Sequence, residues 1–595
     1  MGIYNFYQVP KVSRLPHLIS YSRAVYLGLV LGFFSVAFLR TAWVTEDAYI
    51  TFRVIDNLNA GYGLVWNLGE RVQVFTHPLW LFLLSPVVAV LHDPFWASLL
   101  VSYALLVCVL CLLFFLGRER PLHTMAVLLA LLASRSFIDY SSSGLENPLV
   151  HLLLISFLWV YLRCKTASWR LEFLGSLFSA LYLTRPDSVV VIVPAMLGEF
   201  IGFFWRERRV PWKLLVGTIP IISWTAFSLF YFGSAFPNTA LAKLGTGLSV
   251  IQSFEQALAG IRWVASMDFV TLALIAGGTG VALLHKNLPF RLVGTGIALW
   301  FLYYMKAGGD YMGGRFFSPI TVIAVWLLIE RIRVSALSTR FAWALSVGLV
   351  LLVSLRPHHM LIPALAQEDR FFDRPAGGLF LTLLSPQRFN NMTIDNDGMA
   401  DERGFYYLTQ GMLPNMYDAG AREGALWAAL GSAASQKPGV YLACNIGAFG
   451  YFAGREVEII DPYALSDPFL ARLPVRDGAR IGHYERALPG GYLETVLTGS
   501  SRLHDPALER LWHLISEVSR GDLFSLARLA AIYELNVRAS ELVRASTYER
   551  NDVILPGYVI QSTSKRSCLG QTQAPFIWSV KLREGGAVVA HFSAQ

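Results

Sequence analysis

Charged residues are scarce in this chain. They make up 15% of its 595 residues, against roughly 25% in an average soluble domain. Hydrophobic residues account for 54%, and the mean hydropathy is +0.48. These values exclude a simple soluble protein, and the composition predicts an integral membrane protein.

The chain also has few cysteines and no nucleotide-binding fingerprint. Two of the five cysteines, Cys108 and Cys111, lie in the apolar run LLVCVLCLLFF, where a metal or redox pair has no polar support. Cys444 and Cys568 lie in the more polar second half, where a disulfide is possible if that half is outside the cytoplasm. The sequence contains no Walker-type loop and no Rossmann fingerprint, so nothing indicates a nucleotide.

The positive charge belongs to the apolar part of the chain. Residues 1–355 carry 26 Lys and Arg against 16 Asp and Glu, whereas residues 356–595 carry 23 against 25. A basic excess confined to the apolar half is typical of a membrane orientation signal. We therefore favour this interpretation of the net charge of +8 over a polyanionic partner such as nucleic acid.

Long apolar runs predict about eleven transmembrane helices, because a bilayer core requires about 20 apolar residues per crossing. They fall at 24–43, 95–116, 121–138, 148–164, 170–184, 187–205, 212–232, 268–285, 291–305, 316–332 and 341–355. Segment 77–91 is short, begins with His77-Pro78 and contains Pro86, so we expect a re-entrant or interfacial helix within the first outer loop, 44–94. If it does not cross, 17 of the 26 basic residues share the side of the N-terminus. This bias predicts the N-terminus in the cytoplasm and the C-terminus outside.

The polar second half predicts a separate domain. We expect a transmembrane catalytic domain over 1–355 and a soluble extracytoplasmic domain over 356–595. Alternating runs such as GVYLACNIG, REVEIIDPY and AVVAHFS predict strands, and ALERLWHLISEV and FSLARLAAIYELNV predict amphipathic helices. The fold class is therefore an α-helical polytopic membrane protein with a C-terminal mixed α/β domain.

The predicted outer loops collect unusual polar residues. Glu46 and Asp47 are adjacent acids directly after the first helix, and Thr45 is a candidate N-cap for a short helix that begins there. The other outer-loop segments are SSSGLENP with Glu146, LTRPDS with Arg185 and Asp187, FPNTALAK with Asn238 and Lys243, and KAGGDYMGGRFFSP with Asp310 and Arg315. Charges at membrane depth are costly, so their gathering on one side indicates a functional site.

This combination suits transfer chemistry on a lipid phosphate. Arg185, Lys243 and Arg315, with backbone N–H groups of the glycine-rich turn, are candidates for holding a phosphate. Asp47 or Glu46 is a candidate general base for an acceptor hydroxyl.

Several motifs in a fixed order resemble a known family. They are TEDAYITFR, NAGYGLVWNLGERVQVFTHPLW, SGLEN, LTRPDS, FPNTALAK, GGDYMGGRFFSP, NIGAFGYFAGREVEIIDPYALSDPFLARLP and GHYERALPGGYLE. In this order they resemble GT-C membrane glycosyltransferases, in particular the bacterial terminal arabinofuranosyltransferases. The resemblance covers nearly the whole chain.

The resemblance implies an inverting transfer of arabinofuranose from a decaprenyl or undecaprenyl phosphate. It places the protein in the bacterial cytoplasmic membrane with its active site facing the periplasm. The family's acidic pair is commonly Asp-Asp, and here it is Glu46-Asp47, so the base is assigned to Asp47. Matching by motif also implies donor- or substrate-binding roles for His77, Glu146, Arg185, Asp187, Asn238, Lys243, Asp310 and Arg315.

Several alternatives stay open at this stage. The acceptor is a cell-wall or other surface glycan such as arabinan, or a surface protein such as pilin. A divalent metal is possible, with Glu46, Asp47 and either Asp187 or Asp310 as oxygen ligands. Other functions are transfer of mannose or aminoarabinose from a polyprenyl phosphate, and transport or flipping of a lipid-linked sugar. The lack of a visible internal repeat argues against a transporter.

Overall fold

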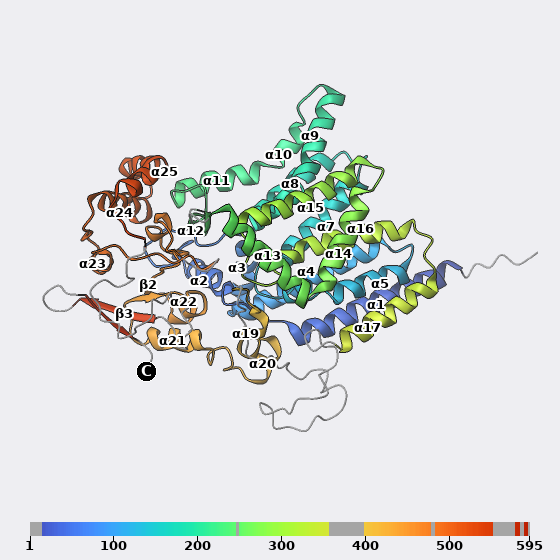
Figure 1. Cartoon of the computed structure of the whole chain (residues 1–595), viewed down its shortest axis with the longest axis horizontal. Helices are drawn as coiled ribbons and strands as arrows, with labels where there is room; N and C mark the ends of the chain where they lie inside the picture. Colours follow the sequence, from blue (N-terminus) through green and yellow to red (C-terminus); the bar gives the residue numbers. More distant parts are fainter. Residues whose placement is uncertain are drawn as a thin grey trace, which may run out of the picture.

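The computed structural model describes residues 15–244, 249–355, 398–477, 482–550, 577–582 and 588–592. The described residues up to 355 form a bundle of helices at the right of Figure 1, and the described residues from 398 onward form a distal half at its left and lower edge. The predicted boundary at residue 356 falls outside the described residues.

The bundle is built mainly from apolar helices of 5 to 27 residues that follow one another along the chain. They are α1 (Leu15–Thr41), α4 (Pro94–Leu116), α5 (Pro121–Leu132), α7 (Asn147–Arg163), α8 (Arg170–Thr184), α9 (Val193–Glu207), α10 (Trp212–Val216), α11 (Ile219–Tyr231), α13 (Val250–Met267), α14 (Phe269–Leu283), α15 (Leu288–Ala307), α16 (Phe317–Arg333) and α17 (Thr339–Leu355). Helix α16 is buried along nearly its whole length and lies at the centre of the bundle.

Four of the described helical segments are long and apolar enough to cross a membrane: Arg23–Thr41, Pro94–Leu116, Trp212–Tyr231 and Leu288–Ala307. The pair α13–α14 would add a fifth, although it is bent by 108°. Four further apolar helices are shorter, at Pro78–Leu91, Pro121–Leu132, Asn147–Arg163 and Thr339–Leu351. The chain is thus a multi-pass helical membrane protein, while eleven crossings and their orientation stay predictions.

The helices depart from the predicted runs at four places. Run 187–205 is divided into the 3-10 helix η1 (Pro186–Val191) and α9, and run 212–232 is divided into α10 and α11. Run 121–138 is divided because the Ser134 hydroxyl accepts from the Phe137 N–H (3.2 Å) and begins a new short helix, α6 (Arg135–Asp139). Helix α13 was not predicted, because Gln252, Glu255 and Arg262 interrupt its apolar pattern.

The loop 44–94 forms two helices, α2 (Ala48–Asn59) and α3 (Pro78–Leu91), and α3 packs against α4 and α8 of the bundle. Asp47 stands at the N-cap of α2 without a side-chain capping bond. The predicted cap by Thr45 is wrong, because its hydroxyl instead donates to Glu402 Oε2 of the distal half (3.1 Å). Most residues of α2 are buried.

The distal half combines helices with a small mixed sheet. Its helices are α19 (Glu402–Gln410), α20 (Met412–Tyr417), α21 (Leu426–Ser435), α22 (Gly447–Ala453), η2 (Leu470–Arg472), α23 (Tyr492–Thr498), α24 (Pro506–Arg520) and α25 (Leu526–Ala545). The strands β1 (Val440–Ala443), β2 (Glu458–Ile460), β3 (Ile577–Leu582) and β4 (Val588–Phe592) run in the order β2-β1-β3-β4. Only β1 and β2 are parallel. Three of the strands lie within the three alternating runs of the sequence.

The two halves are joined through the loop that follows α1. The buried Arg53 of α2 donates to the carbonyls of Trp66, Gly450 and Val457, at 2.6–2.9 Å. The segment that follows α1 bonds to the distal half as well, since the Val44 N–H donates to Gln410 O (3.0 Å). The loop that carries the acid pair is therefore enclosed between the bundle and the distal half.

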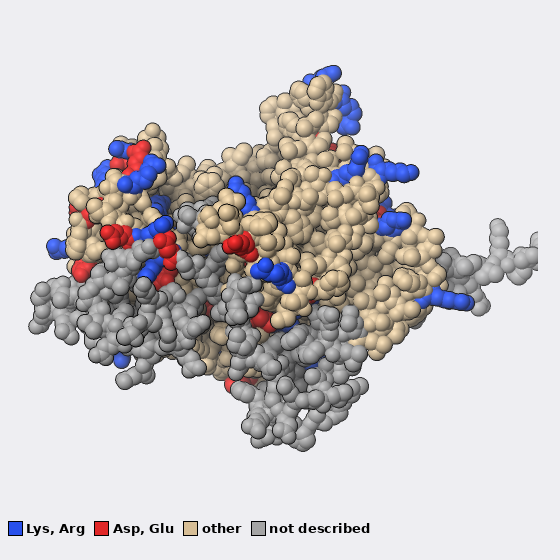
Figure 2. Space-filling view, viewed as in Figure 1, with Lys and Arg blue, Asp and Glu red and all other residues tan. Residues whose placement is uncertain are grey.

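Charged side chains are unevenly placed on the visible surface. At the end of the bundle away from the distal half, almost all of them are Lys or Arg, whereas acidic and basic side chains mix over the distal half (Figure 2). This is the asymmetry on which the orientation prediction rests.

Candidate active site

A cavity of about 40 Å³ lies where the acid pair meets the distal half. The bundle half contributes Glu46, Asp47, Ile50, Tyr311 and Lys243, the last of these from α12 (Asn238–Leu244). The distal half contributes Glu402, Tyr406, Cys444, Asn445, Ile446, Tyr463, Leu465, Gly482 and His483. Both halves of the chain are thus required to form this cavity.

Asp47, the predicted general base, lines the cavity. Among the residues that the structure describes, none donates a hydrogen bond to it or forms an ion pair with it within 4 Å. Burial raises the pKa of Asp47, while the charges of Lys243 and Arg315 oppose the rise. A carboxylate that faces a cavity without an internal partner and with a raised pKa is suited to accept a proton.

Glu46 is held in a different way. Its Oε1 accepts the Ala448 N–H at the start of α22 (3.0 Å). Burial, together with the neighbouring Asp47 and Glu402 carboxylates, raises the pKa of Glu46 to about 8. A methyl group on Gly447 would lie 2.6 Å from this oxygen, so the glycine permits the close approach. Glu46 therefore joins the loop to the distal half, and Asp47 is left to face the cavity.

Glu146 is the centre of a buried ionic cluster near the cavity. Its Oε1 accepts from Arg185 Nη1 (3.1 Å) and Arg315 Nη2 (3.2 Å), and its Oε2 lies 3.4 Å from His77 Nδ1. Because Arg315, His77 and Arg185 surround it, the pKa of Glu146 is lowered to about 2 despite complete burial. Glu146 is thus ionised and fixes both arginines. We call these four residues the Glu146 cluster.

Three members of the cluster have further partners. Arg185 also binds Asp187 (3.1 Å) and lies over the Phe316 ring, so its guanidinium is already well occupied. The His77 Nε2 lies 2.8 Å from Thr51 Oγ1 of α2. Arg315 reaches toward Asp310 at 3.9 Å. The charge of Arg315 also opposes the rise in the pKa of Asp47.

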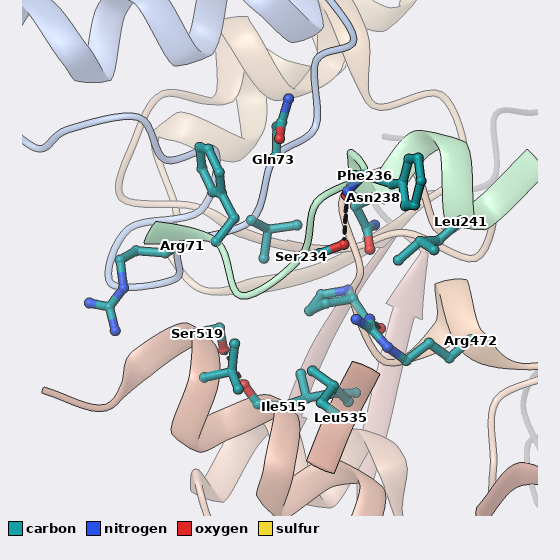
Figure 3. Close-up of a pocket in the computed structure, with 14 residues that line it drawn as sticks. Arg71, Gln73, Ser234, Phe236, Asn238, Leu241, Arg472, Ile515, Ser519 and Leu535 are labelled. Atoms are coloured by element: carbon teal, nitrogen blue, oxygen red, sulfur yellow. Dashed lines mark hydrogen bonds between the residues drawn. The ribbon is translucent and has the colours of Figure 1, made fainter. Parts of the chain in front are cut away.

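Asn238 lies apart from the acid pair. Its amide nitrogen donates to the carbonyls of Ala464, Leu465 and Asp467, at 2.9–3.2 Å. It lines a second, smaller cavity of about 20 Å³, in which Arg71 and Arg472 stand on opposite sides (Figure 3). Both arginines donate to backbone carbonyls, of Gly521 and Pro468 respectively. The structure thus gives Asn238 a role in joining α12 to the distal half.

The predicted site residues therefore fall into three groups. Glu46, Asp47 and Lys243 line the cavity, whereas His77, Glu146, Arg185 and Arg315 form the cluster. Asp187 and Asp310 flank the cluster through its arginines, and Asn238 is separate.

Several cavity residues were not singled out from the sequence. They include Glu402, Tyr311 and His483. The His483 ring lies edge-on to Tyr311 (centroids 4.5 Å apart) and to Tyr463 (5.1 Å). Tyr311 and His483 belong to the quoted motifs GGDYMGG and GHYERALPGG, which are the only signals that pointed to them.

The side chains of this region do not form an evident metal site. In the described ranges, no three or more His, Cys, Asp or Glu side chains are grouped so that they could hold a metal ion. Asp187 is paired with Arg185, and Glu46 is bonded to α22. The predicted oxygen-ligand set is therefore not brought together.

Cys444 is disulfide-bonded, and Cys568 lies outside the described residues.

The chain is 26% identical over 545 residues to the terminal β-(1→2)-arabinofuranosyltransferase of Mycobacterium tuberculosis. This alignment covers 75% of this chain and 81% of the relative. It is 26% identical over 567 residues to the protein of the same name from Corynebacterium glutamicum, with 80% of each chain covered. These relatives confirm the resemblance indicated by the ordered motifs, and with it the assignment as a glycosyltransferase enzyme.

Two further comparisons complete the picture. No protein-family model matches the chain. Among solved structures, ArnT from Cupriavidus metallidurans bound to undecaprenyl phosphate is similar over 76% of this chain and 86% of that protein, with 12% identity and a TM-score of 0.41. The apo state of the same protein gives 12% identity and a TM-score of 0.44 over 74% and 86%.

Proposed function

We propose that the chain transfers arabinofuranose from a polyprenyl-phosphate donor to an acceptor outside the cytoplasmic membrane. The observation that carries the proposal is the Asp47 carboxylate, which faces the cavity without a described partner and has Lys243 on the same cavity wall. The sugar is taken from the two relatives, whose names specify arabinofuranosyl transfer.

The reaction is proposed as a single displacement. The acceptor hydroxyl loses its proton to Asp47 while its oxygen bonds to the anomeric carbon. The bond from the anomeric carbon to the phosphate oxygen breaks, and polyprenyl phosphate leaves with the electron pair. Because the nucleophile and the leaving group lie on opposite faces of the sugar, the anomeric configuration is inverted. A product with the configuration of the donor would contradict this step.

Two cations are proposed to hold the departing phosphate. Lys243 is exposed at the cavity and forms no ion pair within 4 Å with any described residue. Arg315 has a buried Nε without a hydrogen-bond partner in the described structure, in addition to its bond to Glu146. Positive charge fixed in place before the reaction stabilises charge that develops on the leaving group. Arg185 is assigned to positioning, because Glu146 and Asp187 already occupy it.

The location is proposed from charge placement. The N-terminus is placed in the cytoplasm, and the cavity and the distal half face the periplasm. A lipid-linked donor then presents its sugar at the same membrane surface as Asp47. The acceptor is a surface glycan such as arabinan or a surface protein such as pilin.

A deletion strain tests the function in the cell and identifies the acceptor. We expect mass spectrometry of surface polysaccharide and of pilin to show the loss of an arabinofuranosyl residue from one of the two. The wild-type chain should restore this residue, whereas the Asp47→Asn variant should not. Loss of a hexose or of aminoarabinose in its place would favour the alternative donors, and unchanged surface sugars would contradict the proposal.

A further inference from the structure

Helix α25 of the distal half carries two apolar faces. On one face, Ala531, Ile532 and Leu535 are buried in the core of the distal half, where α25 packs against α24. The other face is exposed. Its large side chains are Leu526, Leu529, Tyr533 and Val537, with exposed fractions of 82%, 42%, 73% and 55%.

These four exposed residues form one continuous stripe. They follow one another at intervals of three, four and four residues, so they share one side of the helix. Phe524, 77% exposed, extends the stripe beyond the start of the helix. A helix on a soluble surface normally turns charged residues outward, and an exposed apolar patch marks an interaction site. We call these five residues the α25 stripe.

The stripe adjoins the outer end of a membrane helix. The Phe524 ring lies 5.6 Å from that of Phe230 in α11. From α25, Arg528 donates to Tyr231 O (2.9 Å) and Asn536 donates to Gly233 O (2.8 Å). In Figure 1, the α24–α25 pair lies beyond the end of α11.

Helix α11 itself exposes an apolar surface. It belongs to the candidate membrane span Trp212–Tyr231, of which 17% is buried within the protein. Ile222 and Leu229 are among its exposed side chains. This surface has the composition of a lipid-facing helix, and the α25 stripe begins where it ends.

We propose that the α25 stripe lies in the interfacial layer of the membrane, on the side of the distal half. Its continuity with the lipid-facing surface of α11 identifies the bilayer as its occupant. Tyr533 suits this depth, since its ring is apolar and its hydroxyl reaches water. The charged residues Glu534, Arg538 and Glu541 lie to one side of the stripe along α25, the pattern of a helix that lies flat at a membrane surface.

The contact would hold the distal half against the membrane surface. That half supplies His483 and Tyr463 to the cavity, so its placement fixes the distance between these residues and the bilayer. This inference does not depend on which sugar is transferred.

Depth-dependent quenching tests the proposal. In full-length protein carrying Cys108→Ser, Cys111→Ser and Cys164→Ser, single labels are placed by Tyr533→Cys on the stripe and by Arg538→Cys as the matched control on the same helix. The protein is reconstituted in vesicles whose lipids carry a nitroxide near the headgroup end of the acyl chain. We expect the label at 533 to be quenched at least about threefold more than the label at 538. Leu526→Cys provides a second stripe position if the first variant does not fold.

Two outcomes would overturn the proposal. Equal quenching at 533 and 538 would show that the stripe does not enter the bilayer. Weak quenching at 533 together with cross-linking between two labelled copies, which falls when the protein is diluted in lipid, would show that a second copy of the chain covers the stripe.

Discussion

Replacing Asp47 with asparagine is expected to lower kcat for sugar transfer by about 10²–10⁴-fold, the usual contribution of a general base. The amide cannot take up the acceptor proton. No described residue donates a hydrogen bond to the Asp47 carboxylate, so the change removes no contact of the described structure. Binding of the donor should therefore change little. Initial rates with a synthetic polyprenyl-phosphoryl arabinofuranose, at several donor concentrations, separate kcat from KM.

The neighbouring acid provides the matched control. Glu46→Gln keeps an oxygen that accepts the Ala448 N–H. We expect it to retain most of the activity, because Glu46 is held by α22 and its raised pKa of about 8 keeps it largely protonated at neutral pH. Full activity of Asp47→Asn, or an equal loss in Glu46→Gln, would contradict the assignment of the base.

Replacing Glu146 with glutamine is expected to destabilise the protein by about 3–5 kcal/mol, the cost of breaking a buried ion pair from one side. The change leaves the buried Arg185 and Arg315 without the carboxylate that compensates their charge. Activity should fall as well, since both arginines lose the group that fixes them. Thermal unfolding of the purified variant in detergent, followed by tryptophan fluorescence, measures the change in stability.

Two comparison variants separate the ionic cluster from a general loss of packing. Asp187→Asn removes a partner of Arg185 that lies toward the surface, so a clearly smaller loss is expected. In Glu146→Gln, Arg315 keeps only the distant Asp310 (3.9 Å) as an acidic partner among the described residues, so the double variant Glu146→Gln with Arg315→Gln should recover part of the stability. An unchanged unfolding temperature in Glu146→Gln would show that the cluster contributes no stability.

The sequence predicted the helices of the bundle well, because a long apolar run has few alternatives in a membrane protein. Two of the departures have local causes. A serine N-cap divides run 121–138. Polar residues along α13 interrupt the apolar run by which a membrane helix would have been predicted. The run 77–91 does form a helix, α3 (Pro78–Leu91), whereas its depth in the membrane stays a prediction.

The site could be predicted in part. Asp47 and Lys243 were selected because unusual charges stood in outer loops, and the structure places both at one cavity. Asn238 was selected in the same way, as a polar residue in a predicted outer loop, yet its amide bonds to backbone carbonyls of the distal half. The sequence alone does not distinguish such a structural asparagine from a substrate-binding one. Glu402 was missed because its contact with Thr45 spans 357 residues, and no local pattern records such a distance.

The direct test of the proposed function is a transfer reaction with the purified chain in lipid nanodiscs. Polyprenyl-phosphoryl arabinofuranose and polyprenyl-phosphoryl mannose are supplied separately with the acceptor that the deletion strain identifies. The mass of the product is then measured by mass spectrometry. The account predicts addition of one arabinofuranosyl residue with release of polyprenyl phosphate, and no such addition by Asp47→Asn. Transfer of mannose but not arabinofuranose, or equal transfer by Asp47→Asn, would contradict it.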